Sequence, residues 1–257
     1  PHEIGNVGGF DAMEYMIKAA ERTALDIRYM FPSSVPATDF ETAGATIRSE
    51  DMEGVLERPD IHGFGEYMNS VGVFLADDES LNKLMHAHDA GVVIDGHSPG
   101  LTDKALNAYV AAGIKTDHEC TTIEEMNDRI SRGMYVLLRQ GSASHDLERL
   151  IHGVTSHNYR RCLLCSDDRQ PKTIFENGHL QHHLRICTEA GLDVYSTLMM
   201  ASQNAAECYR LYDRGAIAPG LRADIVLFKD LENFEVKQVF IAGKEVARDG
   251  EYLPEID

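Results

Sequence analysis

The chain has 257 residues, of which 43% are hydrophobic and 26% charged, and these proportions exclude a disordered, collagen-like or coiled-coil protein. Asp and Glu number 42 against 24 Lys and Arg, so the formal net charge is −18. Because nucleic acids and anionic membranes carry the same sign of charge, neither is an expected partner. The sequence has no signal peptide and no apolar stretch of the ~20 residues that cross a bilayer, so we expect a cytoplasmic protein.

Five cysteines are spread along the chain, and an odd, sparse set does not indicate a disulfide framework. We therefore expect a reducing compartment. Cys162 and Cys165 form a CxxC pair inside a predicted buried strand, where positions i and i+3 face opposite sides. This placement favours core packing over a redox or zinc site.

Helical and strand-like patterns of hydrophobic residues alternate along most of the chain. In chain order we predict a helix over 9–24, a strand over 27–31, a helix from 49 to 57, a strand over 61–67, a helix over 79–90, a strand over 92–94, a helix over 102–112, a strand over 114–117, a helix over 122–131, a strand over 134–138, a helix over 145–152, a strand over 162–165, and helices over 174–189 and 196–211. Strands that alternate with helices form right-handed βαβ units and therefore a parallel sheet.

The repeat of strand and helix indicates an α/β fold of the (β/α)8 barrel type, with one unit missing from this chain. The abrupt start at Pro1 suggests that the missing unit precedes it. An open doubly wound sheet is the alternative, but the sequence has no Gly-rich phosphate loop of the GxGxxG or GxxxxGK type. We therefore assign residues 1–213 to a partial barrel.

The pattern changes after about residue 212. Residues 215–220 are rich in turn formers, and short strands are predicted over 224–229, 236–242 and 244–247. Gly243 separates the last two strands, which indicates a hairpin. We assign residues 214–257 to a small β-sandwich portion at the C-terminus.

Side chains that can bind metal ions follow four of the predicted strands. They are Glu66, His97, His118 and Asp167. In barrel enzymes the active site lies at the C-terminal ends of the strands, so we expect these four side chains at one rim. Imidazole and carboxylate ligands suit Zn²⁺, Mn²⁺ or Fe²⁺ and disfavour Ca²⁺. The pattern therefore predicts a metal site.

Two other groups of histidines are weaker candidates. His86 and His88 form an HxH pair, but their segment is helical, where residues i and i+2 diverge, so we interpret them as part of a solvated helix face. His179, His182 and His183 share one predicted helix face. Of these three, we expect His179 to contact substrate.

Several segments together resemble one family. They are PHEI at 1–4, SSVPA at 33–37, GEYMN at 65–69, DGHSPGL at 95–101, HE at 118–119 and SDDR at 166–169. On these segments the chain resembles, almost end to end, the bacterial adenine deaminases of the amidohydrolase superfamily. The combination of GEYMN and DGHSPGL is specific, whereas APGLRADIV at 218–226 resembles the return of superfamily members into their β-sandwich.

The resemblance implies a pair of divalent metal ions, with Mn or Fe favoured and Zn allowed. Glu66 matches the carboxylate that bridges the two ions, and His97 and His118 match ligands of the second ion. Asp167 matches a ligand of the first ion that also moves protons. Members of the family carry an HxH on the first barrel strand, which this sequence lacks. The chain therefore resembles an internal fragment that an N-terminal segment or another chain would complete.

The reaction that the resemblance implies is hydrolysis of adenine to hypoxanthine and ammonia in purine salvage. Two metal ions lower the pKa of a shared water, and the resulting hydroxide attacks C6 of the purine. Asp167 would take the proton and pass it to the departing amine. Glu119 is the candidate for protonating a ring nitrogen, and the alternative is that it orients His118.

Five further residues have weaker predictions. Arg139, Ser142 and Asp168 are candidate substrate contacts, although each also fits a role in holding a loop or an ion pair. His2 and Glu3 are expected at another strand end, where they would contact the metal ligands and orient them without binding the metal themselves.

Two other functions stay open at this point. One is an amidohydrolase reaction on a different purine or on a cyclic amide, because fold does not determine substrate. The other is a catalytically incomplete chain or subunit. We also expect a homo-oligomer, because exposed barrel and sheet edges need covering.

Overall fold

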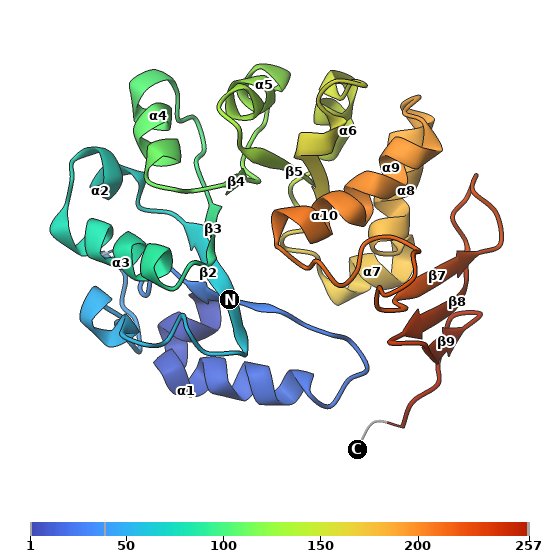
Figure 1. Ribbon diagram of the computed structural model, residues 1–257, viewed down its shortest axis with the longest axis horizontal. Helices are drawn as coiled ribbons and strands as arrows, with labels where there is room; N and C mark the ends of the chain where they lie inside the picture. Colours follow the sequence, from blue (N-terminus) through green and yellow to red (C-terminus); the bar gives the residue numbers. More distant parts are fainter. Residues whose placement is uncertain (1, 39, 256–257) are drawn as a thin grey trace. The chain divides into compact units, whose positions relative to one another are not determined.

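The computed structural model describes residues 2–38 and 40–255. Pro1, which opens the PHEI segment and the predicted barrel portion, lies outside the described residues, as do residues 256–257 of the predicted sandwich portion. Figure 1 shows the described helices and strands in chain order. The described chain divides into two compact units, residues 2–117 and residues 118–255, which we call unit 1 and unit 2.

Unit 1 contains a parallel sheet with the order β1 (Tyr29–Pro32), β2 (Ile61–Tyr67) and β3 (Val93–Gly96). Phe31 pairs with Phe64, and Phe64 pairs with Ile94, so one buried row crosses all three strands. The short strand β4 (Thr116–Asp117) lies beside β3, where the amide of Lys115 donates to the carbonyl of Ile94 at 3.0 Å. The predicted parallel pairing is therefore confirmed in this unit.

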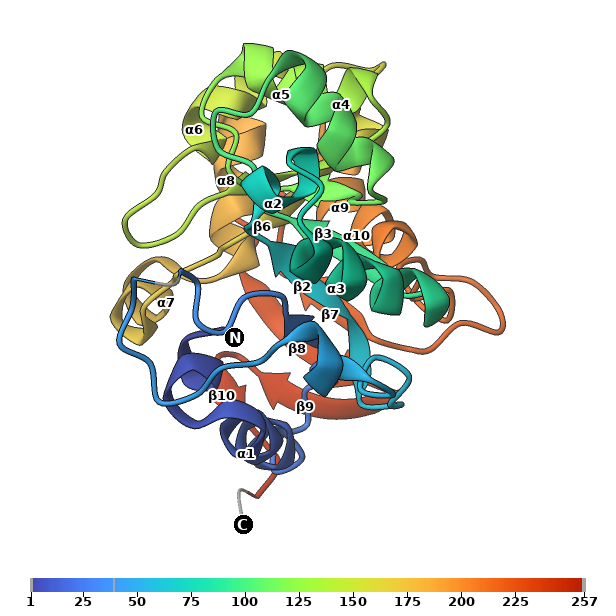
Figure 2. The ribbon, with the colours of Figure 1, turned by 90° about the vertical axis from the view of Figure 1, so that its left-hand side faces the viewer.

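Unit 1 also contains helical segments. They are α1 (His2–Ala20), the 3-10 turn η1 (Ser49–Met52), α2 (Ser70–Phe74), α3 (Asp78–Asp89) and α4 (Asp103–Ala111). The short helix α2 packs against α3 and α4 (Figure 2). Asp77 begins α3 by accepting a hydrogen bond from the amide of Ser80 at 2.9 Å, which satisfies one of the free N–H groups of the first turn.

His2 and Glu3, which we expect after a strand, lie in the first turn of α1. One prediction in unit 1 is wrong. The helix predicted from residue 49 is only a 3-10 turn, because the amide and hydroxyl of Ser49 bind the carboxylate of Glu79 instead of capping a helix. Gly54 then adopts a positive φ of 71°, which ends the local helical path.

Unit 2 contains the parallel pair β5 (Tyr135–Arg139) and β6 (Cys162–Cys165), in which Arg139 pairs with Cys165. Its helices are α5 (Ile123–Ser131), α6 (Leu147–Leu150), η2 (Ile151–Gly153), η3 (Tyr159–Arg161), α7 (Pro171–Asn177), α8 (Leu180–Glu189), α9 (Val194–Ala201) and α10 (Gln203–Cys208). The helix predicted over 174–189 is divided into α7 and α8, because Gly178 takes a φ of 89°. The helix predicted over 196–211 is likewise divided, at Ser202.

The two faces of the β5–β6 pair are both covered by hydrophobic residues. Cys162 faces a core with Val136 and Leu138, whereas Cys165 packs on the opposite face with Leu137. Burial raises the pKa of the Cys162 thiol to about 12, so this thiol stays protonated and acts as a small apolar group. The prediction that the two CxxC cysteines face opposite sides is confirmed.

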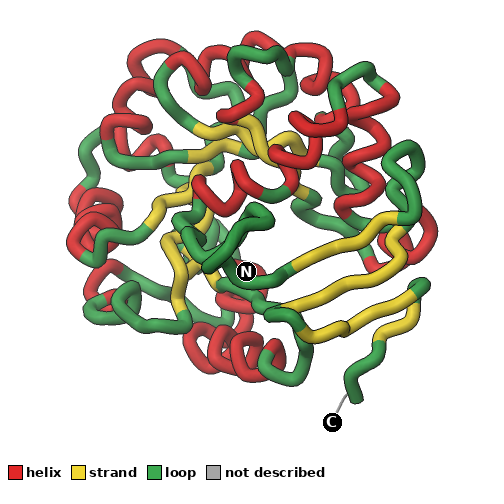
Figure 3. The backbone as a smooth tube through the Cα atoms, turned by 45° about the vertical axis from the view of Figure 1, so that its right-hand side comes forward, coloured by secondary structure: helices red, strands yellow, loops and turns green. Residues whose placement is uncertain are grey.

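An antiparallel sheet ends the chain, with the order β10 (Glu251–Tyr252), β9 (Lys244–Arg248), β8 (Val236–Ile241) and β7 (Ile225–Phe228) (Figure 3). Ala242 and Gly243 both have positive φ angles, as a tight hairpin between β8 and β9 requires. Phe234 is fully buried in the core of unit 2 and contacts Phe228 edge to face. The sheet therefore packs as part of unit 2. In the described chain, no helix combines the length and the apolar character that crossing a bilayer would need.

Because Phe234 anchors this sheet in the core, we expect Phe234→Ala to lower the free energy of unfolding by about 3–5 kcal/mol. Urea denaturation measures this change. Phe175, whose side chain on α7 is exposed, provides a control, and Phe175→Ala should change stability by less than about 0.5 kcal/mol. Equal stability of the two variants would contradict the anchoring role.

Candidate functional site

Glu66 lies at the C-terminal end of β2, and close packing fixes its backbone. Gly65 precedes it, and a Cβ atom at that position would lie 2.7 Å from the Cβ of Met30 in β1. The hydroxyl of Ser33 donates to the carbonyl of Glu66 at 2.6 Å. The neighbouring segment after β1 thus holds the strand end from which the carboxylate projects.

The carboxylate of Glu66 contacts two imidazoles of unit 1. Its Oε1 is 2.8 Å from Nδ1 of His2, and its Oε2 is 3.3 Å from Nδ1 of His97. The hydrogen bond with Glu66 raises the pKa of His2, although burial opposes the rise. Glu3, by contrast, is largely exposed, with its carboxylate 3.5 Å from Nε2 of His2. The structure therefore brings Glu66, His97 and His2 together.

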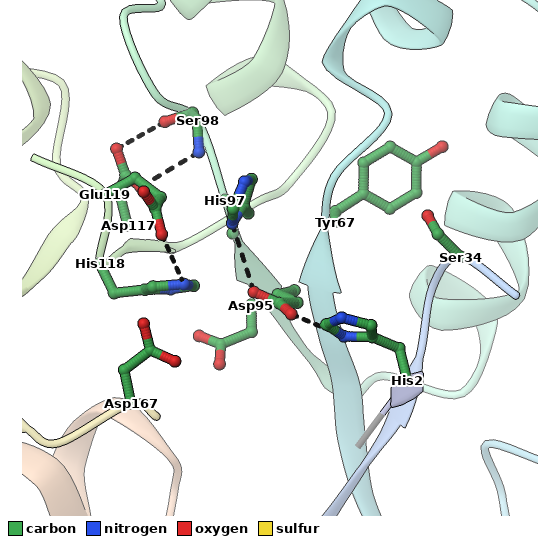
Figure 4. Close-up of polar contacts among 12 residues, drawn as sticks. His2, Ser34, Tyr67, Asp95, His97, Ser98, Asp117, His118, Glu119 and Asp167 are labelled. Carbon is green, nitrogen blue, oxygen red and sulfur yellow. Dashed lines mark hydrogen bonds and ion pairs between the residues drawn. The ribbon is translucent and has the colours of Figure 1, made fainter. Parts of the chain in front are cut away.

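Buried hydrogen bonds fix the backbone around His97. The amide of His97 donates to the hydroxyl of Tyr109 at 2.8 Å, and that hydroxyl donates to the carbonyl of Tyr67. The carboxylate of Asp117 accepts from the amide of Ser98 at 3.1 Å and from its hydroxyl at 2.6 Å (Figure 4). The sequence pattern does not indicate that Tyr109, Ser98 and Asp117 support the site, although Ser98 lies within the DGHSPGL segment.

The second group of candidate ligands lies in unit 2. His118, Glu119 and Asp167 each offer a ligand atom, and these three atoms lie within 4.8 Å of one another. Nε2 of His118 is 3.3 Å from Oε1 of Glu119. Asp167 follows β6 with a φ of 50°, a left-handed conformation that is uncommon for a residue with a side chain. This group combines an imidazole with two carboxylates, a set that suits a transition-metal ion.

Arg139, at the end of β5, joins the carboxylates of unit 2. Its Nη1 donates to Oδ2 of Asp167 at 2.9 Å and also to Glu119. Its Nε and Nη2 donate to Oδ2 of Asp146 at 3.1 and 2.9 Å. Burial opposes the charged form, but these hydrogen bonds outweigh it and raise the pKa of Arg139. The guanidinium is therefore a permanent cation among three acidic side chains.

The other predicted substrate contacts lie in the loops around Asp167. The hydroxyl of Ser142 accepts from the amide of Gln170 at 2.8 Å, and the carbonyl of Asp168 accepts from the amide of Ser142 at 2.9 Å. These bonds hold the two loops together. Nε2 of His179 is 3.2 Å from the hydroxyl of Ser166, the residue before Asp167. Contact of these residues with a substrate stays a prediction.

His183 and His88 contact backbone carbonyls. His183 is fully buried in α8, with its ring nitrogens 3.1 Å from the carbonyl of His179 and 3.0 Å from that of Cys165. Burial lowers the pKa of His183 to about 4. His86 and His88 lie on α3, as predicted, and Nε2 of His88 is 3.0 Å from the carbonyl of Ala112.

Comparison with known proteins identifies the class. The sequence pattern of the amidohydrolase family matches residues 2–246, so the chain belongs to this family. The β-aspartyl dipeptidase of Fervidobacterium islandicum AW-1 has a similar fold, with a TM-score of 0.70 at 16% identity over 96% of this chain and 72% of that chain. The N-acetyl-D-glucosamine-6-phosphate deacetylase of Mycobacterium smegmatis has a TM-score of 0.64 at 16% identity, over 92% of this chain and 71% of that chain.

Similar sequences narrow the class further. The chain is 56% identical to adenine deaminase 2 of Desulfotalea psychrophila over 100% of its own length and 44% of that protein. It is 48% identical to the adenine deaminase of Ligilactobacillus salivarius, again over 100% of this chain and 44% of that protein. The resemblance to bacterial adenine deaminases is thus confirmed, and the chain spans about 44% of the length of these relatives.

The buried neutral state of His183 predicts a loss of stability in acid. Its pKa is about 4 in the folded chain and about 6.5 when unfolded, so below pH 6.5 the unfolded state binds the proton more readily. The free energy of unfolding should fall by about 2 kcal/mol between about pH 7 and about pH 4.5 from this residue alone.

Urea denaturation at the two pH values measures the effect. In His183→Gln that part of the pH dependence should disappear, whereas a control substitution of exposed His157 by Gln should retain it. If His183→Gln keeps the full pH dependence of the free energy of unfolding, His183 is not the cause of the loss of stability in acid.

Proposed function

We propose that this chain supplies metal-binding and proton-transfer residues of an adenine deaminase, which converts adenine and water into hypoxanthine and ammonia. The observation that carries the proposal is the identity of 43–56% to proteins named adenine deaminase over nearly the whole of this chain. The chain spans about 44% of the length of those proteins, so the rest of a complete enzyme lies outside the residues described.

The donor chemistry of both units fits divalent metal ions. Glu66 has one oxygen 2.8 Å from His2 and the other 3.3 Å from His97, and a carboxylate beside imidazoles would suit a divalent ion. His97 follows β3 and His118 follows β4 in the chain, and the Ser98–Asp117 hydrogen bonds hold the backbone next to His97. We propose Glu66, His97, His118 and Asp167 as ligands of two ions, with Mn or Fe favoured and Zn allowed. Such ions lower the pKa of water and supply a nucleophile at neutral pH.

The two carboxylates near His118 have complementary roles in this proposal. Asp167 takes the proton that water loses on attack at C6 and delivers it to the departing amine, so that ammonia leaves. Glu119, in its protonated form, gives its proton to a ring nitrogen as C6 becomes tetrahedral, and it regains a proton from the C6 hydroxyl when ammonia leaves and the carbonyl of hypoxanthine forms. Their ligand atoms lie within 4.8 Å of each other, which favours proton transfers around a single substrate ring.

The remaining assignments of function extend the same proposal. His179 is the substrate contact that the geometry favours, because its ring lies beside Ser166, next to Asp167 in the chain. Ser142 and Asp168 would shape the same loops, with the carbonyl of Asp168 accepting from the amide of Ser142. His2 supports Glu66 through their hydrogen bond.

We further propose that residues 1–213 form part of a (β/α)8 barrel and that residues 214–257 form part of a β-sandwich. Parallel pairing of β1 with β2, β2 with β3 and β5 with β6 supports the barrel. The antiparallel β7–β10 sheet supports the sandwich, and self-association would cover β7 at its edge. The odd number of cysteines and the acidic charge support a cytoplasmic location.

An ammonia-release assay on the longest natural polypeptide that carries these residues tests the function. With Mn²⁺ or Fe²⁺ supplied, adenine should react, and guanine, cytosine and a cyclic imide should not. Asp167→Asn should lower kcat by about 10²–10⁴-fold, because the proton acceptor is lost. Asp213→Asn, which removes an exposed carboxylate paired with Arg214, should leave kcat unchanged. Absence of adenine turnover in the unsubstituted protein would overturn the proposal.

Metal analysis after dialysis tests the ligand set without any activity measurement. We expect two ions per chain in the longest natural polypeptide, and Glu66→Gln in that polypeptide should weaken metal binding by at least about 100-fold, because it removes the proposed bridging carboxylate. Exposed Glu57 provides the matched control, and Glu57→Gln should bind like the unsubstituted protein. Equal metal content in both variants would exclude Glu66 as a ligand.

A further inference from the structure

One guanidinium in unit 2 binds the acidic side chains of three separate segments. Glu119 follows β4 in the chain, Asp146 immediately precedes α6, and Asp167 follows β6. Arginine has five N–H groups, and four of those on Arg139 point at these carboxylates: two from Nη1, one from Nε and one from Nη2. A side chain engaged to this extent has little capacity left for a substrate.

Burial makes these contacts strong. The side chain of Arg139 is 9% exposed, and those of Glu119 and Asp146 are 16% and 17% exposed. At such sites two neighbouring carboxylates repel each other more strongly than in water. Because Nη1 of Arg139 donates to both Glu119 and Asp167, it offsets this repulsion and keeps the two acids near one point.

Asp146 determines how the guanidinium is turned. Nε and Nη2 of Arg139 both donate to its Oδ2, and a planar guanidinium that is held along this edge has a fixed direction for Nη1. The backbone of Asp146 is itself fixed, since its carbonyl accepts from the amide of Leu150 at 2.9 Å, and Leu147 and Leu150 are fully buried. The core of unit 2 therefore sets the position of Asp146.

We propose that Asp146 and Arg139 form a positioning pair that holds Glu119 and Asp167 in the arrangement needed for proton transfer. Arg139 is then a positioning residue and not the substrate contact that the sequence predicts. The proposal rests on the deaminase function proposed above. It gives Asp146, which the sequence did not single out, an effect on catalysis without contact with substrate.

Asp146→Asn in the longest natural polypeptide, loaded with Mn²⁺ or Fe²⁺, tests the pair. The substitution keeps the size of the side chain and removes its charge, so the guanidinium loses its orientation. We expect kcat for adenine to fall by about 100-fold, because small misplacements of reacting groups have effects of that order. KM should stay within about threefold, because the substrate contacts remain.

Asp128→Asn is the matched control, since it breaks an aspartate–arginine pair with Arg132 on the partly exposed face of α5. Its kcat should stay within about twofold of the unsubstituted protein. Asp146→Glu keeps the charge and should recover part of the activity that Asp146→Asn loses. Arg139→Ala should respond to millimolar ethylguanidinium with increased kcat, whereas Asp146→Asn should not.

The outcomes separate the two proposals. Normal kcat in Asp146→Asn, with an active unsubstituted protein, overturns the positioning pair and leaves the deaminase function intact. A raised KM at unchanged kcat in Arg139→Lys also overturns it, because Arg139 would then bind substrate. If the unsubstituted protein does not deaminate adenine, the deaminase function fails, and the positioning role with it.

Hydrogen exchange of the Arg139 guanidinium, followed by ¹⁵N NMR, gives a readout independent of activity. We expect slow exchange of its Nε proton in the unsubstituted protein and in Asp128→Asn, and fast exchange in Asp146→Asn. Equally slow exchange in all three proteins would show that Asp146 does not hold the guanidinium and would overturn the proposal.

Discussion

The hydrogen bonds between Asp117 and Ser98 are the interaction on which the proposed site depends. A buried carboxylate loses its hydration on folding, and the amide and hydroxyl of Ser98 replace it with charge-assisted bonds. These bonds hold the C-terminal ends of β3 and β4 beside each other. His97 adjoins Ser98 in the chain, so the contact that satisfies the buried carboxylate of Asp117 also fixes the backbone from which the His97 imidazole projects.

Charge is balanced differently in the two units. In unit 1, Glu66 is shared between the imidazoles of His2 and His97, which are weak bases. In unit 2, the single cation Arg139 meets three carboxylates, so the group keeps an excess of negative charge. Such an excess is unfavourable within the protein alone and favourable beside divalent cations. The carboxylates around Arg139, whose mutual repulsion is unfavourable without a metal ion, are therefore suited to bind the divalent ions that the family relationship implies.

The sequence predicts the strands best where burial is continuous. The bounds predicted for β2 and β6, 61–67 and 162–165, agree with the structure because runs of apolar residues and glycines there belong to strands packed on both faces. Helix ends are predicted less well, because single contacts decide them. Ser49 resembles a helix cap but binds Glu79, and Gly178 interrupts an otherwise helical pattern. Neither partner nor backbone angle is visible in a local pattern.

The sequence by itself determined the family, the alternation of strands and helices, and the metal-binding residue types at the strand ends. Each of these properties depends on residues that are close together in the chain or on the spacing between short segments. Only the tertiary structure revealed that His2 reaches Glu66 from a helix and that Asp146 holds Arg139 against Glu119 and Asp167. Such contacts join side chains from separate elements. Their partners depend on packing and on the direction of each side chain, which no local pattern of residues specifies.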